Sequence, residues 1–202
     1  MPMKFVKSTT VAFFTISIML CQTDIAGAAQ SLAINLNDRD EVELTFIGES
    51  KYSENTTIKN ETGVLSALDE LDNKNIYAHT GFANTGLTDI PGIVFGLGID
   101  LAGSYIDKSQ DSYAAVALKL KLGYVLPFRI LTTVSGAVSY APKTLCLSNN
   151  INNFSDTRIE IDFDVIDGGT IFVGTRDIKY GIPDNGTFTL NKSGYGGFKI
   201  HF

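Results

Sequence analysis

Much of the chain alternates between apolar residues and polar or small residues, a pattern typical of β-strands with one face in apolar surroundings. The last residues show it clearly, because Phe198, Ile200 and Phe202 share one face while Lys199 and His201 share the other. A soluble domain gains little by ending a strand on an aromatic residue, whereas a barrel in a bilayer places such residues against acyl chains. The terminal strand therefore predicts a transmembrane β-barrel.

The same alternation predicts an all-β, antiparallel barrel of about ten strands. A hairpin over 32–36 and 42–46 opens the barrel, and the terminal strand closes it. The strands predicted between them are a weak one at 56–59 and longer ones at 76–83, 93–102, 113–124, 128–140, 157–165 and 171–178. Treating 31–47 as a single strand gives eight strands instead, but this alternative places Asp38 and Asp40 in lipid. We therefore prefer ten.

Small residues fill one face of the strand predicted at 93–102, where Gly96 and Gly98 alternate with large apolar residues. Such a face suits the inside of a narrow barrel, in which side chains share a tight lumen.

Residues 49–75 interrupt the alternation. The segment is polar and rich in Asn, Glu and Lys, and it contains a short amphipathic stretch at 64–71. We expect an exposed excursion here, with one short helix at 64–71.

The strand predicted at 128–140 gives a dimension. Phe128 and Tyr140 lie twelve residues apart on one face, which corresponds to about 40 Å along a strand and roughly 28 Å across a bilayer at a tilt of about 45°. Aromatic residues at both rims of an apolar band of about 25 Å are typical of barrels in the outer membrane.

The predicted connections after residue 103 alternate in length. They are long at 104–111, 141–153 and 180–191 and short at 125–127 and 166–169. Bacterial barrels have short periplasmic turns and longer external loops, so the short turns are expected on the periplasmic side.

The N-terminal segment has the pattern of a secretory signal peptide, with Lys4 and Lys7, an apolar run from 11 to 20, and small residues at 26–29. We therefore expect a signal peptide at 1–29 and the barrel at 30–202. An alternative is lipidation at Cys21, but Leu20 occupies a position where a lipoprotein signal requires a small residue.

Composition narrows the function classes. The net charge of -6 gives no basic surface for a nucleic acid partner. Removal of the signal peptide would leave Cys146 as the remaining cysteine, which excludes an internal disulfide. An exported chain of this kind has to be held together by its sheet.

Two local patterns resemble known sequences. The stretch Asp111–Ala117, leading to Gly123-Tyr124, and then Ser139-Tyr140-Ala141-Pro142, resembles the YfaZ family of outer-membrane proteins. The resemblance implies an outer-membrane barrel of undefined activity in a Gram-negative envelope. Tyr195, Gly197, Ile200 and Phe202 also resemble the C-terminal signal of outer-membrane proteins, which implies barrel assembly machinery as a partner, together with outer-membrane lipid and lipopolysaccharide.

Catalytic chemistry is weakly indicated. A hydrolase needs a nucleophile, a histidine and a carboxylate within hydrogen-bond reach, and the chain has His79 and His201 as its histidines. Both fall on inward faces, where we expect them to join a polar lumen network. The sequence therefore predicts a protein that is not an enzyme, with no catalytic, cofactor or metal site.

Charged residues on inward faces are nearly balanced, with six acids against five bases. Near balance favours a cross-linked, largely filled lumen over a selective channel, because buried charges are tolerated when they pair or stay hydrated. The predicted lumen charges are Asp100, Lys119, Lys121, Arg158, Glu160, Asp162, Asp164, Arg176 and Lys199, with Glu41 and Glu43 beside them.

Three functions remain open at this point. The preferred one is a small outer-membrane barrel with an envelope-structural or narrow, porin-like role. The second is an outer-membrane hydrolase of the lipid A deacylase type, which requires a serine and a carboxylate close to one histidine. The third is a secreted β-sandwich that binds a ligand, which would bury Leu118, Leu120 and Ile159 in a dry interior and expose Lys119.

Overall fold

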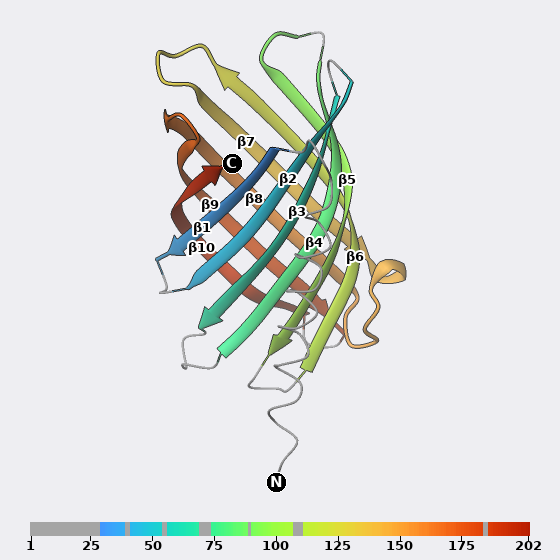
Figure 1. Ribbon diagram of the computed structural model, residues 1–202. Coiled ribbons are helices and arrows are strands. Elements are labelled where there is room, and N and C mark those ends of the chain that lie inside the picture. Colours follow the sequence, from blue (N-terminus) through green and yellow to red (C-terminus); the bar gives the residue numbers. More distant parts are fainter. Residues whose placement is uncertain are drawn as a thin grey trace.

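The computed structural model describes residues 29–38, 41–53, 56–68, 74–88, 90–106, 111–183 and 186–202, which form ten antiparallel strands in one closed barrel (Figure 1). Of the predicted signal peptide, residues 1–28 lie outside the described residues. The strands are β1 (Ala29–Asn37), β2 (Val42–Ser53), β3 (Thr56–Leu68), β4 (Lys74–Leu87), β5 (Ile93–Ile106), β6 (Asp111–Leu126), β7 (Thr132–Pro142), β8 (Asn153–Ile166), β9 (Gly169–Ile182) and β10 (Gly186–His201). The predicted all-β barrel of ten strands is confirmed.

Each strand pairs with its neighbour in sequence, and β1 pairs with β10 to close the wall. The closing register runs from Ser31 opposite His201 to Asn37 opposite Tyr195. Beyond Ser31, the backbone of Gln30 exchanges two hydrogen bonds with Phe202, at 3.2 and 2.9 Å. The first and last strands therefore meet along nearly the whole length of β1.

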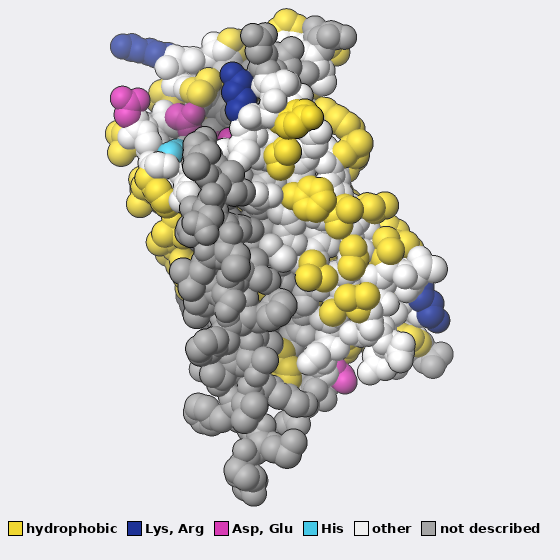
Figure 2. All heavy atoms as spheres, turned by 45° about the vertical axis from the view of Figure 1, so that its right-hand side comes forward, with side chains coloured by type: hydrophobic (Ala, Val, Ile, Leu, Met, Phe, Trp, Pro, Cys, Tyr) yellow, Lys and Arg dark blue, Asp and Glu magenta, His cyan; other side chains and the backbone are white. Residues whose placement is uncertain are grey.

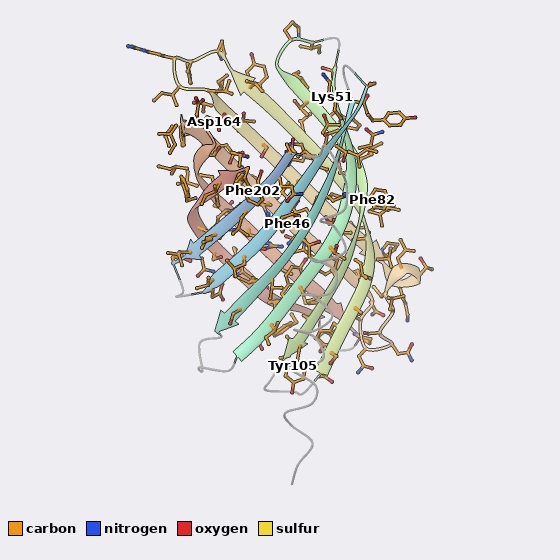
Figure 3. The ribbon with its side chains drawn as sticks, viewed as in Figure 1. Phe46, Lys51, Phe82, Tyr105, Asp164 and Phe202 are labelled. Carbon is orange, nitrogen blue, oxygen red and sulfur yellow. The ribbon has the colours of Figure 1, made fainter. Side chains whose placement is uncertain are left out.

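The barrel has two distinguishable ends. We call the end at which β1 begins and β10 finishes the terminal end, and the opposite one the far end. Lys51 and Asp164 lie toward the terminal end, and Tyr105 lies toward the far end (Figure 3). In the described residues, the longest connection joins β7 to β8 at the far end.

The inward and outward faces follow the predicted alternation. On β6, Leu118, Leu120 and Leu122 are 60%, 46% and 56% exposed, while Lys119 between them is 9% exposed. Hydrophobic side chains cover much of the outer wall in the view of Figure 2, with charged side chains near the two ends. The polarity is thus the inverse of a soluble core, and the sandwich alternative is wrong.

Residues 56–68 are a strand, which confirms the weak strand predicted at 56–59 and extends it. The prediction of an exposed excursion at 49–75 with a helix at 64–71 is wrong over 49–53, 56–68 and 74–75, which belong to β2, β3 and β4. β3 pairs with β2 on one side and with β4 on the other. The sequence of β3 lacks the alternation that predicts a strand, because both of its faces carry polar residues. Lys59 and Glu61 lie on the inner face, and Asn60 lies on the outer one. Closure of the barrel supplies hydrogen bonds on both sides, and these outweigh the missing alternation.

The strand predicted at 128–140 begins later, at Thr132, so the rim-to-rim dimension based on Phe128 is wrong. Pro127 has no N–H for the ladder, and the N–H of Phe128 bonds back to Leu126 at 2.8 Å in a tight turn. β7 has 11 residues, about 37 Å long and roughly 26 Å across a bilayer at the usual tilt.

The predicted alternation of long and short connections is also wrong in part. The loop expected at 180–191 is largely strand, because β9 runs to Ile182 and β10 begins at Gly186, with a register shift between Thr189 and Asn191. Asn, Gly and Pro residues in this stretch indicated a loop, yet Thr187 to Thr189 pair with β9. The short turn between β8 and β9 is where it was predicted.

The connection between β7 and β8 is the long loop expected from the sequence. It starts with a 3-10 turn, η1 (Lys143–Leu145), and then runs beside the first part of β6. There the backbone of Cys146 forms an isolated antiparallel β-bridge with Ala115. The N–H of Leu147 donates to the carbonyl of Ala114 at 2.8 Å. The loop thus continues the wall where β7 has already ended. Among the described residues, no helix is long and apolar enough to cross a membrane.

Candidate functional site

The lumen changes character along the barrel axis. On β5, buried Asp100 is followed on the inner face by buried Ala102, and on β9 buried Arg176 is followed by buried Ile178. Both strands run from the terminal end to the far end, so charge gives way to apolar side chains in that direction. Three parts result, which we call the aromatic plug, the ionic layer and the cup.

The aromatic plug fills the far half and consists of Tyr77, Tyr113, Phe154 and Tyr180, all buried. Ring centroids lie 6.4 Å apart between Tyr77 and Phe154, and 5.1 Å apart both between Phe154 and Tyr180 and between Tyr180 and Tyr113. These rings come from four strands and pack into one buried apolar cluster with inward alanines of β5, β6 and β7. The far half is therefore a packed core.

The ionic layer lies next to the plug, and Arg176 is its most deeply buried cation. Its Nη1 donates to Glu43 Oε1 at 2.6 Å, and its Nη2 and Nε donate to the two oxygens of Asp156 at 2.6 and 3.0 Å. The guanidinium also stacks over the Tyr77 ring, 5.0 Å from its centroid. Arg176 thus connects β9 to β2, β4 and β8 in a low-dielectric interior, where such pairs are strong.

Glu61 extends the ionic layer to the other side of the lumen. One of its oxygens accepts from Arg158 Nη1 and the other from Lys119 Nζ, both at 3.1 Å. Lys119 also donates to Asp100 Oδ1 at 3.3 Å, and Arg158 Nη2 lies 3.5 Å from Glu43 Oε1. These contacts make the network continuous. Its members are Glu43, Glu61, Asp100, Lys119, Asp156, Arg158 and Arg176, contributed by six strands.

Two further polar side chains complete the ionic layer. Ser139 Oγ donates to Asp100 Oδ2 at 2.5 Å, and His79 Nε2 lies 3.4 Å from Glu43 Oε1. His79 therefore lies in the polar lumen network that was expected for it. Every charged member has at least one oppositely charged partner, which is what keeps buried ions tolerable.

The cup is a cavity of about 330 Å³ between the ionic layer and the terminal end. Its floor includes Asp100, Asp156 and Arg158, and its rim includes exposed Asp164 and His201. On the wall, Lys199 donates to Asp162 at 3.2 Å and lies 3.6 Å from Glu160, which accepts from Tyr195 Oη at 2.9 Å. Charged and hydroxyl side chains line the cup together with apolar surface from residues such as Ala83, Val94 and Phe172.

The nine predicted lumen charges all lie on the inner face, and the structure divides them among the parts of the lumen. Lys121 faces the cup, and its ammonium group makes no hydrogen bond or ion pair with the described part of the chain. Asp164 accepts a hydrogen bond at the rim. Asp100, Lys119, Arg158 and Arg176 belong to the ionic layer, and Glu160, Asp162 and Lys199 form the group on the cup wall.

Sequence reasoning missed two members of the ionic layer, Glu61 and Asp156. Glu61 was assigned to the excursion at 49–75, although it is an inward residue of β3 that pairs with two cations. Asp156 stands one residue before the strand predicted at 157–165. Continuing the alternation of Arg158 and Glu160 backward by one step would have placed it inward.

A chain of side-chain hydrogen bonds crosses four adjacent strands at the rim. Ser31 Oγ lies 2.7 Å from His201 Nδ1, His201 Nε2 lies 2.9 Å from Thr170 Oγ1, and Thr170 Oγ1 donates to Asp164 Oδ1 at 2.5 Å. All four residues line the cup. The structure thus places His201 in the polar network expected for it and adds two hydroxyls and a carboxylate.

The proton positions along the rim chain follow from the acceptors. The carboxylate of Asp164 takes the single hydrogen of the Thr170 hydroxyl, so Thr170 accepts from His201 Nε2–H. In the neutral imidazole, Nδ1 is then the unprotonated nitrogen, and it accepts the O–H of Ser31. Every donor in the chain is directed toward Asp164.

The described residues contain no cluster of side chains suited to metal binding, and they contain one free thiol. No group of three His, Cys, Asp or Glu side chains there has the geometry to hold a metal ion. Cys146 is a free thiol in the loop between β7 and β8, where burial raises its pKa.

Comparisons with known proteins gave no match, either to a protein-family model or to a curated protein. The functional argument therefore starts from the lumen and the outer wall.

Proposed function

We propose that the protein is an integral barrel of the bacterial outer membrane with an envelope-structural role. The observation that carries this proposal is the inverted polarity of the wall, in which Leu118, Leu120 and Leu122 are exposed while Lys119 between them is buried. Water would penalise such an outer surface, and acyl chains would accept it.

The dimensions support a position across a bilayer. The strands have 9 to 16 residues, which meets the requirement of about 9–11 residues for a tilted membrane strand. The outer face of β5 carries Phe95, Leu97, Ile99 and Leu101, all exposed. Together with the N-terminal segment expected to direct export, this favours the outer membrane as the location.

The filling of the lumen favours a structural barrel over a narrow pore. Ions crossing from the cup would meet the paired charges of the ionic layer and then the rings of the aromatic plug. Conduction requires a hydrated or coordinating path along the whole axis. We therefore place the porin-like role second.

The expected partners follow from the outer wall and the seam. Outer-membrane lipid and lipopolysaccharide would contact the apolar belt. Phe198 and Ile200 on β10 and Phe202 directly after it are exposed, which fits insertion by barrel assembly machinery through β10. Membership of the YfaZ family stays a prediction from the sequence.

Fractionation of a Gram-negative host that expresses the full chain tests the proposal. We expect the protein in the outer-membrane fraction, released by detergent and not by salt or carbonate. It should migrate faster on a gel before boiling than after it, as closed barrels do. Recovery in the soluble periplasmic fraction without detergent would contradict the proposal.

A further inference from the structure

A serine hydroxyl and an imidazole meet at the rim of the cup in a geometry that nucleophilic catalysis requires. Ser31 and His201 face each other across the β1–β10 seam, and Oγ and Nδ1 are 2.7 Å apart. Among the described residues, the other histidine, His79, has Glu43 as its hydrogen-bonding partner instead of a hydroxyl. Ser31 is buried in the wall yet lines the cavity.

The second ring nitrogen of His201 is oriented as well. Its Nε2–H donates to Thr170 Oγ1 at 2.9 Å, and the Thr170 hydroxyl donates in turn to Asp164 Oδ1 at 2.5 Å. This arrangement fixes the tautomer in which Nδ1 can take the Ser31 proton, and the carboxylate stabilises the imidazolium that would form. The orienting carboxylate acts here through one hydroxyl.

We propose that this rim is a hydrolytic site for small carboxylic esters, with Ser31 as nucleophile and His201 as general base. Thr170 and Asp164 are its positioning residues. The assignment goes beyond the structural role of the barrel, and it opposes the prediction from the sequence that the protein has no catalytic residue.

The reaction balances with water as the co-reactant. Ser31 Oγ attacks the ester carbonyl while His201 Nδ1 takes the hydroxyl proton, and the tetrahedral intermediate then expels the alcohol, which receives that proton from His201. Water, deprotonated by His201, attacks the acyl-serine. The carboxylic acid leaves, and the proton returns to Ser31.

The cup determines the class of substrate. Its volume of about 330 Å³ lies at the lower end of the range for ligand pockets. Carboxylates, ammonium groups and hydroxyls line it beside apolar parts of the wall, and Lys199 on that wall is paired with Glu160 and Asp162. A short acyl group fits this volume and can lie against the apolar part of the wall, while the charged and hydroxyl side chains can bond a polar alcohol. A long acyl chain exceeds the volume.

The test uses the full chain folded in detergent micelles, with heat-modifiable migration as the check of folding. A fluorophosphonate should label the wild type, and peptide mass spectrometry should locate the label on Ser31. Hydrolysis of p-nitrophenyl acetate should fall by about 100-fold or more in S31A and in H201N. The matched control is S193A, which changes an inward serine in the middle of β10, bonded to Asn191 at 3.0 Å, and should leave both readouts unchanged.

Positioning by Thr170 is tested separately. T170A should lower the rate about tenfold or more, and T170S, which keeps the hydroxyl, should restore it. A purely structural latch between β1, β10 and β9 would give heat-labile variants without fluorophosphonate labelling of the wild type.

Three results would overturn the assignment. They are a folded wild type that is not labelled, a label at another residue, or labelling of Ser31 without turnover of p-nitrophenyl acetate or p-nitrophenyl palmitate. Faster hydrolysis of p-nitrophenyl palmitate than of the acetate would overturn the substrate class. If S31A does not fold, the site mapped on the wild type decides the question.

Discussion

Arg176 and Asp156 form a two-point ion pair between adjacent strands, with Nη2–Oδ2 and Nε–Oδ1 distances of 2.6 and 3.0 Å. The same guanidinium donates to Glu43 on β2. β2 and β9 are separated in the sheet order by β1 and β10, so the contact passes through the lumen. Arg176 therefore braces the barrel internally as well as joining two neighbours.

Replacing Arg176 by Met should destabilise the barrel strongly. The change leaves Glu43 and Asp156 with reduced compensation in a buried layer, and loss of one partner of a buried pair costs about 3–5 kcal/mol. Chemical unfolding of the protein in micelles, followed by far-UV circular dichroism, measures the change in the free energy of unfolding.

The matched control for R176M is Lys179→Met on the same strand. Lys179 pairs with Asp177 at 2.5 Å, and its side chain is 40% exposed. Loss of such a pair should cost less than about 1 kcal/mol. Equal effects of the two substitutions would show that the ionic layer has no special role in stability.

A lysine in the apolar belt should be costly if the belt faces acyl chains. Leu120 on β6 is exposed and lies between Leu118 and Leu122. L120K should lower the free energy of unfolding in lipid vesicles by about 2–4 kcal/mol near the bilayer midplane.

The same substitution outside the belt provides the comparison. Leu147 is 64% exposed in the loop between β7 and β8, so L147K should change the stability by about 0.5 kcal/mol or less. If both variants insert and unfold like the wild type, Leu120 does not contact hydrocarbon.

The sequence predicted the wall well where lipid and lumen differ most. On β5 and β6, large apolar residues alternate with Asp100, Lys119 and glycines, so one period-two pattern identifies both faces. Beyond the weak strand at 56–59, β3 could not be found in this way. Its identity comes from pairing with β2 and β4, and this pairing is a property of the closed sheet.

The rim chain was out of reach of the sequence for a different reason. Alternation placed His201 inward, but its partner Ser31 lies 170 positions away. Their meeting depends on the register in which β1 closes on β10. A shift of one residue would turn one of the two side chains outward.

Gly98 tests how closely the strands pack inside the barrel. A Cβ at this inward position would collide with the carbonyl oxygen of Phe82 and lie 2.7 Å from the Cα of Ala83. Both obstacles are backbone atoms, which cannot turn away. G98A should therefore lower the free energy of unfolding by about 1–3 kcal/mol.

Gly48 on β2 is the control for G98A. A Cβ there would meet no atom within 4 Å, so G48A should be neutral or slightly stabilising, because alanine restricts the unfolded chain more than glycine does. A neutral G98A would mean that β4 and β5 can separate locally, and that small residues are not needed on this face.

Conductance separates a filled barrel from a narrow pore. Tyr77, Phe154 and Tyr180 pack in a continuous series of rings across the far half, and the hydroxyl of Tyr77 bonds to Asp156 at 3.2 Å. Opening a path would require these rings to leave a buried cluster and expose apolar surface to water. We therefore expect no resolved current steps from the wild type in planar bilayers. The double variant F154A/Y180A removes two rings and should give small steps or flicker. Steady currents from the wild type, unchanged in this variant, would place the ion path elsewhere and contradict a sealed lumen.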